Sequence, residues 1–299
     1  MGEISGKNLS WQAGAAAVIV AFCWGGNFAA SKFAMAHMDP FLTVWLRFFL
    51  LSLMLAPLVW KYARPNMQQM FILSIFSITI HFAFIFYAIW AGLSVTSAII
   101  AVQMGVPFSC LMAAIFYKDY LGPWRSFGLL VSFAGLLVVS GTPNVVEYWW
   151  PFMLGIVGAL GWACANTYMK HMEPTHVVNM LFWPGLMSLP QMGVLSYVFE
   201  DNQLDQILNA PTSAWLGIAY SAVFSSVIGY GLWMSLLKRY TMSQVVPFSL
   251  LAPMVGIASG VLIFHDPLGP LVIGGSALTV LGVAIISIRR PRLTRTEPS

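Results

Sequence analysis

Residues 117–123 read Y-K-D-Y-L-G-P, and residues 264–270, which lie 147 positions further along the chain, read F-H-D-P-L-G-P. The same offset carries three small residues onto identical ones: Gly128 onto Gly275, Gly135 onto Gly282 and Ser140 onto Ser287. Upstream, W-G-G-N-F-A-A-S-K (24–32) is echoed by W-A-C-A-N-T-Y-M-K (162–170) with the same spacing from Trp to Lys. The chain is therefore a duplicated unit, and we predict that it divides into residues 1–145 and 146–299.

The composition excludes a soluble globular domain. Of the 299 residues, 59% are hydrophobic and 8% are charged, whereas a soluble domain carries about 25% charged residues. Runs of about 20 apolar residues recur, each long enough to cross a hydrocarbon core roughly 30 Å thick. We predict an all-α polytopic membrane protein. The three cysteines lie within apolar runs and are interpreted as packing residues.

Polar, proline and glycine clusters separate ten predicted transmembrane helices, five in each unit. The first five cover residues 12–35, 41–60, 70–91, 96–116 and 124–140. The second five cover residues 149–169, 177–199, 213–236, 243–264 and 269–288. The loops between them are too short to form a separate soluble domain.

The basic residues set the predicted orientation. Apart from Lys32 and Arg47, they all lie at the termini or in even-numbered loops: Lys7, Lys61, Arg64, Lys118, Arg125, Lys170, Lys238, Arg239, Arg289, Arg290, Arg292 and Arg295. The odd-numbered loops carry acidic residues instead: Asp39, Glu147, Glu200, Asp201, Asp205 and Asp266. Both termini are predicted to be cytoplasmic. Because each unit has an odd number of spans, we predict that the two five-helix repeats are inverted relative to each other.

Ten spans in a five-plus-five duplication, with a tryptophan and a distal lysine in the first span, resemble the drug/metabolite transporter (DMT) superfamily. The pair Arg47–Phe48 and the proline-containing fourth and ninth spans, each ending in an acidic turn, are similar to its EamA-type branch. That branch often has Glu where this chain has Asp119 and Asp266. The aromatic-rich first half looks most like the YddG-type exporters of aromatic and other neutral amino acids. The resemblance covers essentially the whole chain and implies a bacterial inner-membrane exporter with a central cavity that opens to one side at a time.

Two duplicated pairs of polar and aromatic residues are candidates for substrate binding. Trp24, Asn27 and Ser31 share one face of the first span, and the sixth span repeats the pattern with Trp162 and Asn166. An indole ring packs on an apolar side chain, and a carboxamide binds a carboxylate or an ammonium group. We predict that both pairs line the cavity. The alternative is that the tryptophans pack helices together and the asparagines bond across them.

A further duplicated pattern is Tyr87-x-x-Trp90 in the third span and Tyr230-x-x-Trp233 in the eighth. We predict Tyr87 and Tyr230 in the cavity. We place Trp90 and Trp233 in an interfacial belt or in helix packing. The tyrosines have the same alternative.

His81 and Gln103 complete the predicted binding residues. His81 lies well inside the third span, where it could bind a carboxylate or carry a proton, because the ordinary pKa of histidine is near physiological pH. The alternative is a neutral histidine bonded to a neighbouring helix. Gln103 shares a helical face with Thr96 and Pro107.

Three prolines are candidate hinge or gate residues: Pro107 in the fourth span and Pro247 and Pro253 in the ninth. A proline inside a helix removes one backbone hydrogen bond and frees a carbonyl, which suits a helix that bends or faces a cavity. The alternative is a static kink.

Lys32 and Arg47 are predicted near the outer side. An arginine there could grip a carboxylate or a phosphate. We favour structural roles, with Lys32 reaching the outer interface and Arg47 bonding to carbonyls or Asp39. The second unit has Leu181 where the first has Arg47, each seven residues after a proline.

These features predict a secondary transporter that exports neutral amino acids, aromatic ones and also Thr and Met, by alternating access. No Asp or Glu lies deep within a predicted span, so we expect facilitated export or weak proton coupling through His81. The alternative is a carrier of phosphorylated metabolites, nucleotide sugars or drugs. We expect no enzyme activity, because no paired nucleophile and base lies within the spans. We expect the lipid bilayer and a small-molecule substrate as partners, with no cofactor, no metal, no nucleic acid and no obligate protein partner.

Overall fold

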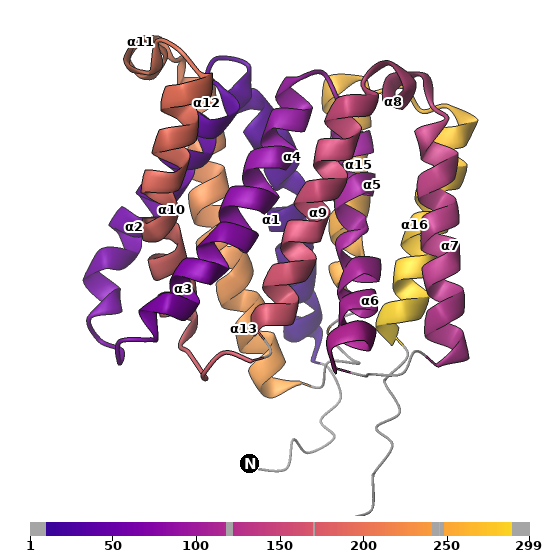
Figure 1. The fold of residues 1–299 in the computed structure, drawn as a ribbon, viewed down its shortest axis with the longest axis horizontal. Coiled ribbons are helices and arrows are strands. Elements are labelled where there is room, and N and C mark those ends of the chain that lie inside the picture. Colours follow the sequence, from indigo (N-terminus) through magenta and orange to yellow (C-terminus); the bar gives the residue numbers. More distant parts are fainter. Residues whose placement is uncertain (1–9, 118–121, 170, 241–244, 246–247, 289–299) are drawn as a thin grey trace, which may run out of the picture.

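The computed structural model describes residues 10–117, 122–169, 171–240, 245 and 248–288. Throughout these parts of the chain the regular structure is helical, without a strand. The helices stand side by side in one bundle (Figure 1). α1 begins and α16 ends at one face of the bundle, which we call the terminal face, whereas α8 and α11 lie at the other, the opposite face (Figure 1).

The helices of the first half are α1 (Trp11–Met35), α2 (Pro40–Val59), α3 (Met67–Ser74), η1 (Ile75–Ile80), α4 (His81–Trp90), α5 (Val95–Gln103), α6 (Gly105–Tyr117), α7 (Pro123–Ser140) and α8 (Pro143–Glu147). Those of the second half are α9 (Trp149–Met169), α10 (Val177–Phe199), α11 (Gln203–Asn209), α12 (Thr212–Tyr220), η2 (Ser221–Gly229), α13 (Tyr230–Arg239), α15 (Leu251–Phe264) and α16 (Pro270–Ile288). The two η elements are π-helices.

Within the described residues, seven continuous helical runs are long and apolar enough to cross a membrane. Two further apolar helices, Leu251–Phe264 and Pro270–Ile286, are shorter. α10 is 23 residues long but is not among the seven runs, because polar residues such as Asn179 and Gln191 lower its mean hydropathy. The ninth predicted span, 243–264, begins outside the described residues. The protein is thus an all-helical, multi-pass membrane protein, and the number of ten spans stays a prediction.

The third and eighth predicted spans each contain a π-helix. The third is formed by α3, η1 and α4, and the eighth by α12, η2 and α13. Periodicity predicts uninterrupted α-helices there, because an apolar run of this length shows where a span lies but not the hydrogen-bonding pattern of each turn. π-Helical segments are rare and are frequently found at functional sites. Because π-helices occur at corresponding places in both halves, these two helices are candidates to form part of the functional site.

α7 and α16 lie side by side at one edge of the bundle (Figure 1). A Cβ atom on Gly128 would stand 2.9 Å from the carbonyl oxygen of Gly282, and one on Gly135 would stand 2.7 Å from that of Gly275. The helices therefore run antiparallel and approach at glycines, as small residues allow in membrane proteins. Each glycine opposes the copy of the other one, which is the reciprocal pattern of a two-fold contact.

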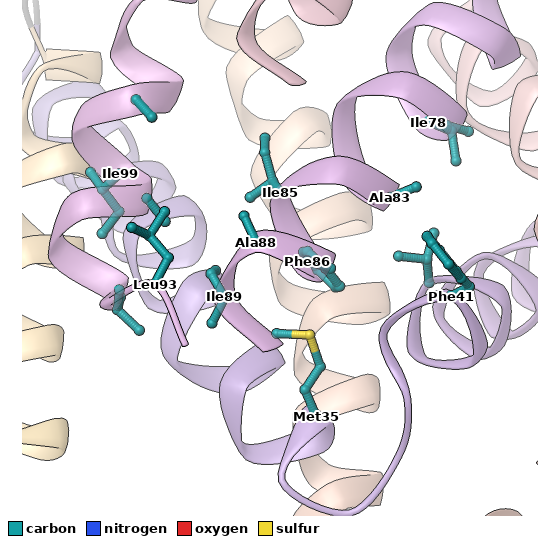
Figure 2. Packing of buried hydrophobic residues seen from close by; sticks show 14 of the residues in the cluster. Met35, Phe41, Ile78, Ala83, Ile85, Phe86, Ala88, Ile89, Leu93 and Ile99 are labelled. Atoms are coloured by element: carbon teal, nitrogen blue, oxygen red, sulfur yellow. The ribbon is translucent and has the colours of Figure 1, made fainter. Parts of the chain in front are cut away.

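The largest hydrophobic cluster lies between helices of both halves. Figure 2 shows part of it, with Met35 from α1, Phe41 from α2, and Phe86 and Ile89 from α4. Met35 is the last residue of α1, and Phe41 is the second residue of α2. Other members continue along α2 to its last residue, Val59, so the cluster runs through the bundle from the opposite face toward the terminal face.

Two carboxylates of the second half cap helices of the first half at the opposite face. Glu200 accepts hydrogen bonds from the N–H groups of Phe41 (2.5 Å) and Leu42 (3.0 Å) at the start of α2. Asp266 accepts one from the N–H of Thr96 (2.9 Å) at the start of α5. Burial raises the pKa of the Glu200 carboxyl, and its two bonds to backbone N–H groups oppose that rise. The copy of this turn at Asp119 lies outside the described residues.

The contact between α7 and α16 predicts opposite results for two neighbouring substitutions. A Cβ atom on Gly275 would stand 2.8 Å from the carbonyl oxygen of Gly135, whereas one on Gly274 would meet nothing within 4 Å. We expect Gly275→Ala to destabilise the protein by about 1–3 kcal/mol, because the helices must separate. The measurement is the melting temperature in detergent, followed by a thiol-reactive dye that reports exposure of the buried Cys23 and Cys110.

Gly274→Ala is the matched control on the same helix. It should leave the melting temperature unchanged or raise it, since alanine favours a helix over glycine by about 0.5–1 kcal/mol. Equal losses for both variants would contradict the close contact.

The cap on α2 predicts that Glu200→Ala lowers stability by about 0.5–2 kcal/mol, the usual loss for a removed helix cap. The neighbouring exposed residue Asp201 provides the control, and Asp201→Ala should change stability by less than about 0.5 kcal/mol. The same dye measurement compares the two. A melting temperature of Glu200→Ala equal to that of Asp201→Ala would show that the cap contributes nothing.

Candidate functional site

Two adjoining cavities lie in the interior of the bundle, with volumes of 210 Å³ and 250 Å³. They share walls contributed by both halves of the chain, formed by Trp24, Arg47, Phe82, Trp162 and Tyr230. The first cavity extends toward the terminal face, because its other walls include the end of α9 and the start of α10. The second lies between α1, α4, α5 and α15. We call the two together the central site.

Seven of the eight predicted binding residues line the central site. The first cavity is lined by Trp24, Trp162, Asn166 and Tyr230. The second is lined by Trp24, Asn27, His81, Gln103, Trp162 and Tyr230. The structure thus brings together the polar faces of the first and sixth predicted spans, together with residues of the third, fourth and eighth.

Trp24 lies in an aromatic group on the α1 side of the site. Its ring centroid is 5.3 Å from that of Tyr230 and 5.3 Å from that of Trp233, with tilted planes. A Cβ atom on Gly229 would stand 2.7 Å from the Trp24 Nε1 atom, so glycine is needed for the indole to fit. Trp24 Nε1 is buried and has no hydrogen-bond partner among the described residues. Trp233, predicted in a belt or in helix packing, lines the first cavity.

Trp162 and His81 lie together on the α9 side. Their ring centroids are 5.0 Å apart. The Nδ1 atom of His81 lies 2.9 Å from the carbonyl oxygen of Gly158. Because a carbonyl can only accept, Nδ1 carries the proton and donates this bond. His81 thus has the contact of a histidine tied to a neighbouring helix and also lines the second cavity.

The amide side chains add polarity at separate places. Asn27 is buried, and its Oδ1 atom has no hydrogen-bond partner among the described residues. Gln103 is the last residue of α5. Its backbone carbonyl has no α-helical donor four residues later, because Pro107 lacks an N–H. An acceptor at Asn27 suits an ammonium group.

Tyr87 lies outside the central site and lines neither cavity. Its ring stacks on Phe41 with centroids 5.8 Å apart, and it also contacts Trp90. His81 and Tyr87 both lie in α4, and residues six apart are rotated by about 120° around an α-helix, so the two side chains do not face the same cavity. Trp90 is 47% exposed, as expected for an interfacial residue.

The predicted hinge residues fall at three different places. Pro107 lies in α6, immediately after the break between α5 and α6 at Met104. Pro253 is near the start of α15 and lines the second cavity. Pro247 lies outside the described residues.

Arg47 is the residue of the site that sequence reasoning placed elsewhere. Its side chain is 2% exposed, and it lines both cavities. Its Nη2 atom donates a hydrogen bond of 3.1 Å to the hydroxyl of Ser226 in η2. Asp39, the partner considered for it, bonds instead to Gln206. The signal available in the sequence was depth: seven residues beyond Pro40, an α-helix has risen by about 10 Å into the membrane.

Lys32 behaves differently from Arg47. Its Nζ atom lies 4.0 Å from Asp266 and 4.4 Å from the centre of the Phe264 ring. It lines neither cavity. Lys32 therefore helps to join α1 to the end of α15 at the opposite face, rather than serving the central site.

The sequence matches the EamA-like transporter family twice, over residues 12–141 and over residues 149–288. It is 29% identical over 291 residues to a probable amino-acid metabolite efflux pump of Salmonella typhimurium, covering 93% of this chain and 95% of that protein. A protein of the same description from Escherichia coli is 28% identical over 288 residues, with the same coverage. The fold is similar to a solved crystal structure at a TM-score of 0.64 and 17% identity, covering 92% of this chain and 96% of that chain.

Proposed function

Because the chain belongs to the EamA-like transporter family, we propose that it exports neutral amino acids across the bacterial inner membrane by alternating access. Aromatic amino acids are among the proposed substrates, together with threonine and methionine. The substrate class is carried over from the two bacterial relatives, which are described as probable amino-acid metabolite efflux pumps. The proposal treats the chain as a carrier without catalytic activity.

The chemistry of the central site carries this proposal. Its shared walls are four aromatic side chains and one arginine, with amide groups at Asn27, Gln103 and Asn166. Aromatic walls bury an apolar or aromatic side chain over a large area. The few polar groups can hold the charged end of a zwitterion, as is usual in small-molecule sites.

We also propose that the chain has ten spans in two inverted five-helix repeats, residues 1–145 and 146–299. The antiparallel contact of α7 with α16 supports this arrangement, because Gly128 opposes Gly282 and Gly135 opposes Gly275. The two segments matched by the family support the duplication. Inverted repeats build a midplane site that can face either side of the membrane.

In the proposed orientation both termini are cytoplasmic, so the terminal face is the cytoplasmic one. The first cavity lies in the half of the bundle nearest that face, while the two carboxylate caps lie at the opposite face. The structure then corresponds to a state that loads from the cytoplasm. Release requires the contacts at the opposite face to separate.

A carrier of phosphorylated metabolites or nucleotide sugars is a weaker fit. Such a ligand carries several negative charges and calls for several cations in the site. Among the described residues that line the two cavities, Arg47 is the one lysine or arginine. A single cation matches the single carboxylate of an amino acid.

We propose facilitated export down the solute gradient. Within the described part of the chain, no Asp or Glu lines the central site. His81 is the histidine among them, and its Nδ1 proton is held by the carbonyl of Gly158. A proton-coupled carrier needs a titratable group in its pathway, so His81 is where coupling would have to act.

The substrate proposal predicts counterflow in proteoliposomes. Vesicles loaded with unlabelled phenylalanine should accumulate labelled Phe, Thr and Met, while vesicles loaded with a nucleotide sugar should not accumulate the labelled nucleotide sugar. The reason is that the site offers aromatic and amide walls and one cation. Exchange of the nucleotide sugar without exchange of amino acids would overturn the proposed substrate class.

A pair of tryptophan variants ties the exchange to the central site. Trp24→Ala should raise the half-saturating concentration of phenylalanine by about 2- to 12-fold, the loss of one aromatic contact. Trp149, which is 60% exposed at the opposite face, serves as the control, and Trp149→Ala should leave that concentration unchanged.

The facilitated mechanism predicts that a pH gradient alone drives no uphill transport of phenylalanine. Exchange in the absence of a pH gradient measures any effect of His81→Gln on substrate binding, separately from proton drive. His37 is exposed, so His37→Gln controls for general effects of removing a histidine. Uphill transport that is lost in His81→Gln and kept in His37→Gln would instead identify His81 as a proton carrier.

A further inference from the structure

Arg47 is a buried cation without an anionic partner. Of its three guanidinium nitrogens, Nη2 bonds to the neutral hydroxyl of Ser226, while Nε and Nη1 are buried with no hydrogen-bond partner among the described residues. The described structure gives it no carboxylate: Asp39 is engaged by Gln206, Glu200 by the start of α2, and Asp266 by Lys32 and α5. Most buried charges in proteins are paired.

Aromatic contacts compensate this charge only in part. The guanidinium carbon lies 4.3 Å from the centre of the Phe82 ring and 5.3 Å from that of Phe48. Contacts of a cation with an aromatic face are weaker than the penalty for burying an unpaired ion. A residue that is so costly to the empty protein is best explained by an anion that binds in the cavities that it lines.

We propose that Arg47 binds the carboxylate of the transported amino acid, an inference that rests on the proposed function. The planar guanidinium presents paired N–H donors that match the two oxygens of a carboxylate. Ser226 holds the group through one bond, so a small rotation of the side chain presents the remaining donors to a ligand. The unpartnered Trp24 Nε1 belongs to the same shared wall and is a further donor for this end.

The asymmetry between the two halves orients the substrate. Leu181 in α10, which stands in the second unit where Arg47 stands in the first, lines the first cavity together with Met180 and Pro184. The carboxylate end therefore lies against α2, and the apolar side chain extends toward α10. In the second cavity, the unpartnered Oδ1 atom of Asn27 accepts from the ammonium group.

Competition with an analogue that lacks the carboxylate tests the proposal. In wild-type proteoliposomes, phenylalaninamide should compete with labelled phenylalanine about ten- to hundred-fold more weakly than phenylalanine does, since a hydrogen-bonded charge is lost. In Arg47→Gln, phenylalanine should compete more weakly than in wild type by a similar factor. Phenylalanine and phenylalaninamide should then compete equally. Arg64, which is exposed, gives the control: Arg64→Gln should keep the wild-type preference.

Two further variants keep the test decisive if Arg47→Gln folds poorly. Arg47→Lys retains the positive charge but loses the paired N–H donors of the guanidinium group. It should show an intermediate preference for phenylalanine over its amide. Arg47→Leu introduces the residue of the second unit and should melt at or above the wild-type temperature, because an unpaired buried charge is removed.

The outcomes separate this inference from the proposed function. Suppose that Arg47→Gln and Arg47→Lys both exchange amino acids and keep the wild-type preference for phenylalanine over its amide. That result would overturn the role of Arg47 and leave the proposed function standing. A fall in the melting temperature of Arg47→Leu together with that persistence would assign Arg47 a structural role. Absence of amino-acid exchange in the wild type would overturn the proposed function itself.

Discussion

Helices in a membrane gain little from burying apolar side chains against one another, because lipid is equally apolar, so the bundle depends on close approach. Glycine provides that approach at the contacts between halves. Between α7 and α16 a side chain on Gly128 or Gly135 would strike backbone atoms, and on α9 a side chain on Gly158 would stand 2.9 Å from the carbonyl oxygen of His81. The latter contact also brings His81 within hydrogen-bond distance of α9. The glycines at these helix contacts thus help to set the position of the central site.

The second physical demand is that backbone polar groups be satisfied inside a bilayer. At the opposite face, residues far away in the sequence satisfy these groups, because Glu200 and Asp266 of the second half cap α2 and α5 of the first half. Near the central site it is met less regularly: the π-helices η1 and η2 use i→i+5 bonds, and Pro107 removes the α-helical donor for the carbonyl of Gln103. Regular backbone thus forms the frame, and irregular backbone is concentrated in the helices that surround the cavities.

The sequence predicted the helical architecture because apolar runs about 20 residues long have one physical interpretation. It also grouped the residues of the central site well, because duplicated faces such as Trp24 with Asn27 point toward a shared interior. It failed where tertiary geometry decides. Tyr87 has the same spacing to Trp90 as Tyr230 has to Trp233, yet it stacks on Phe41. Arg47 was placed at the outer side, although its position seven residues beyond Pro40 already puts it about 10 Å into the membrane.

The caps at the opposite face join the halves at the face that must open for release in the proposed orientation. Each turn of an alternating-access cycle would break the bonds from Glu200 to α2 and from Asp266 to α5, or move them as a unit with the helices that they cap. If they break, the free energy that keeps the empty cavity sealed is also part of the activation barrier for release. Thermal stability and turnover would then be opposed in this protein, and stronger caps would produce a more stable but slower carrier.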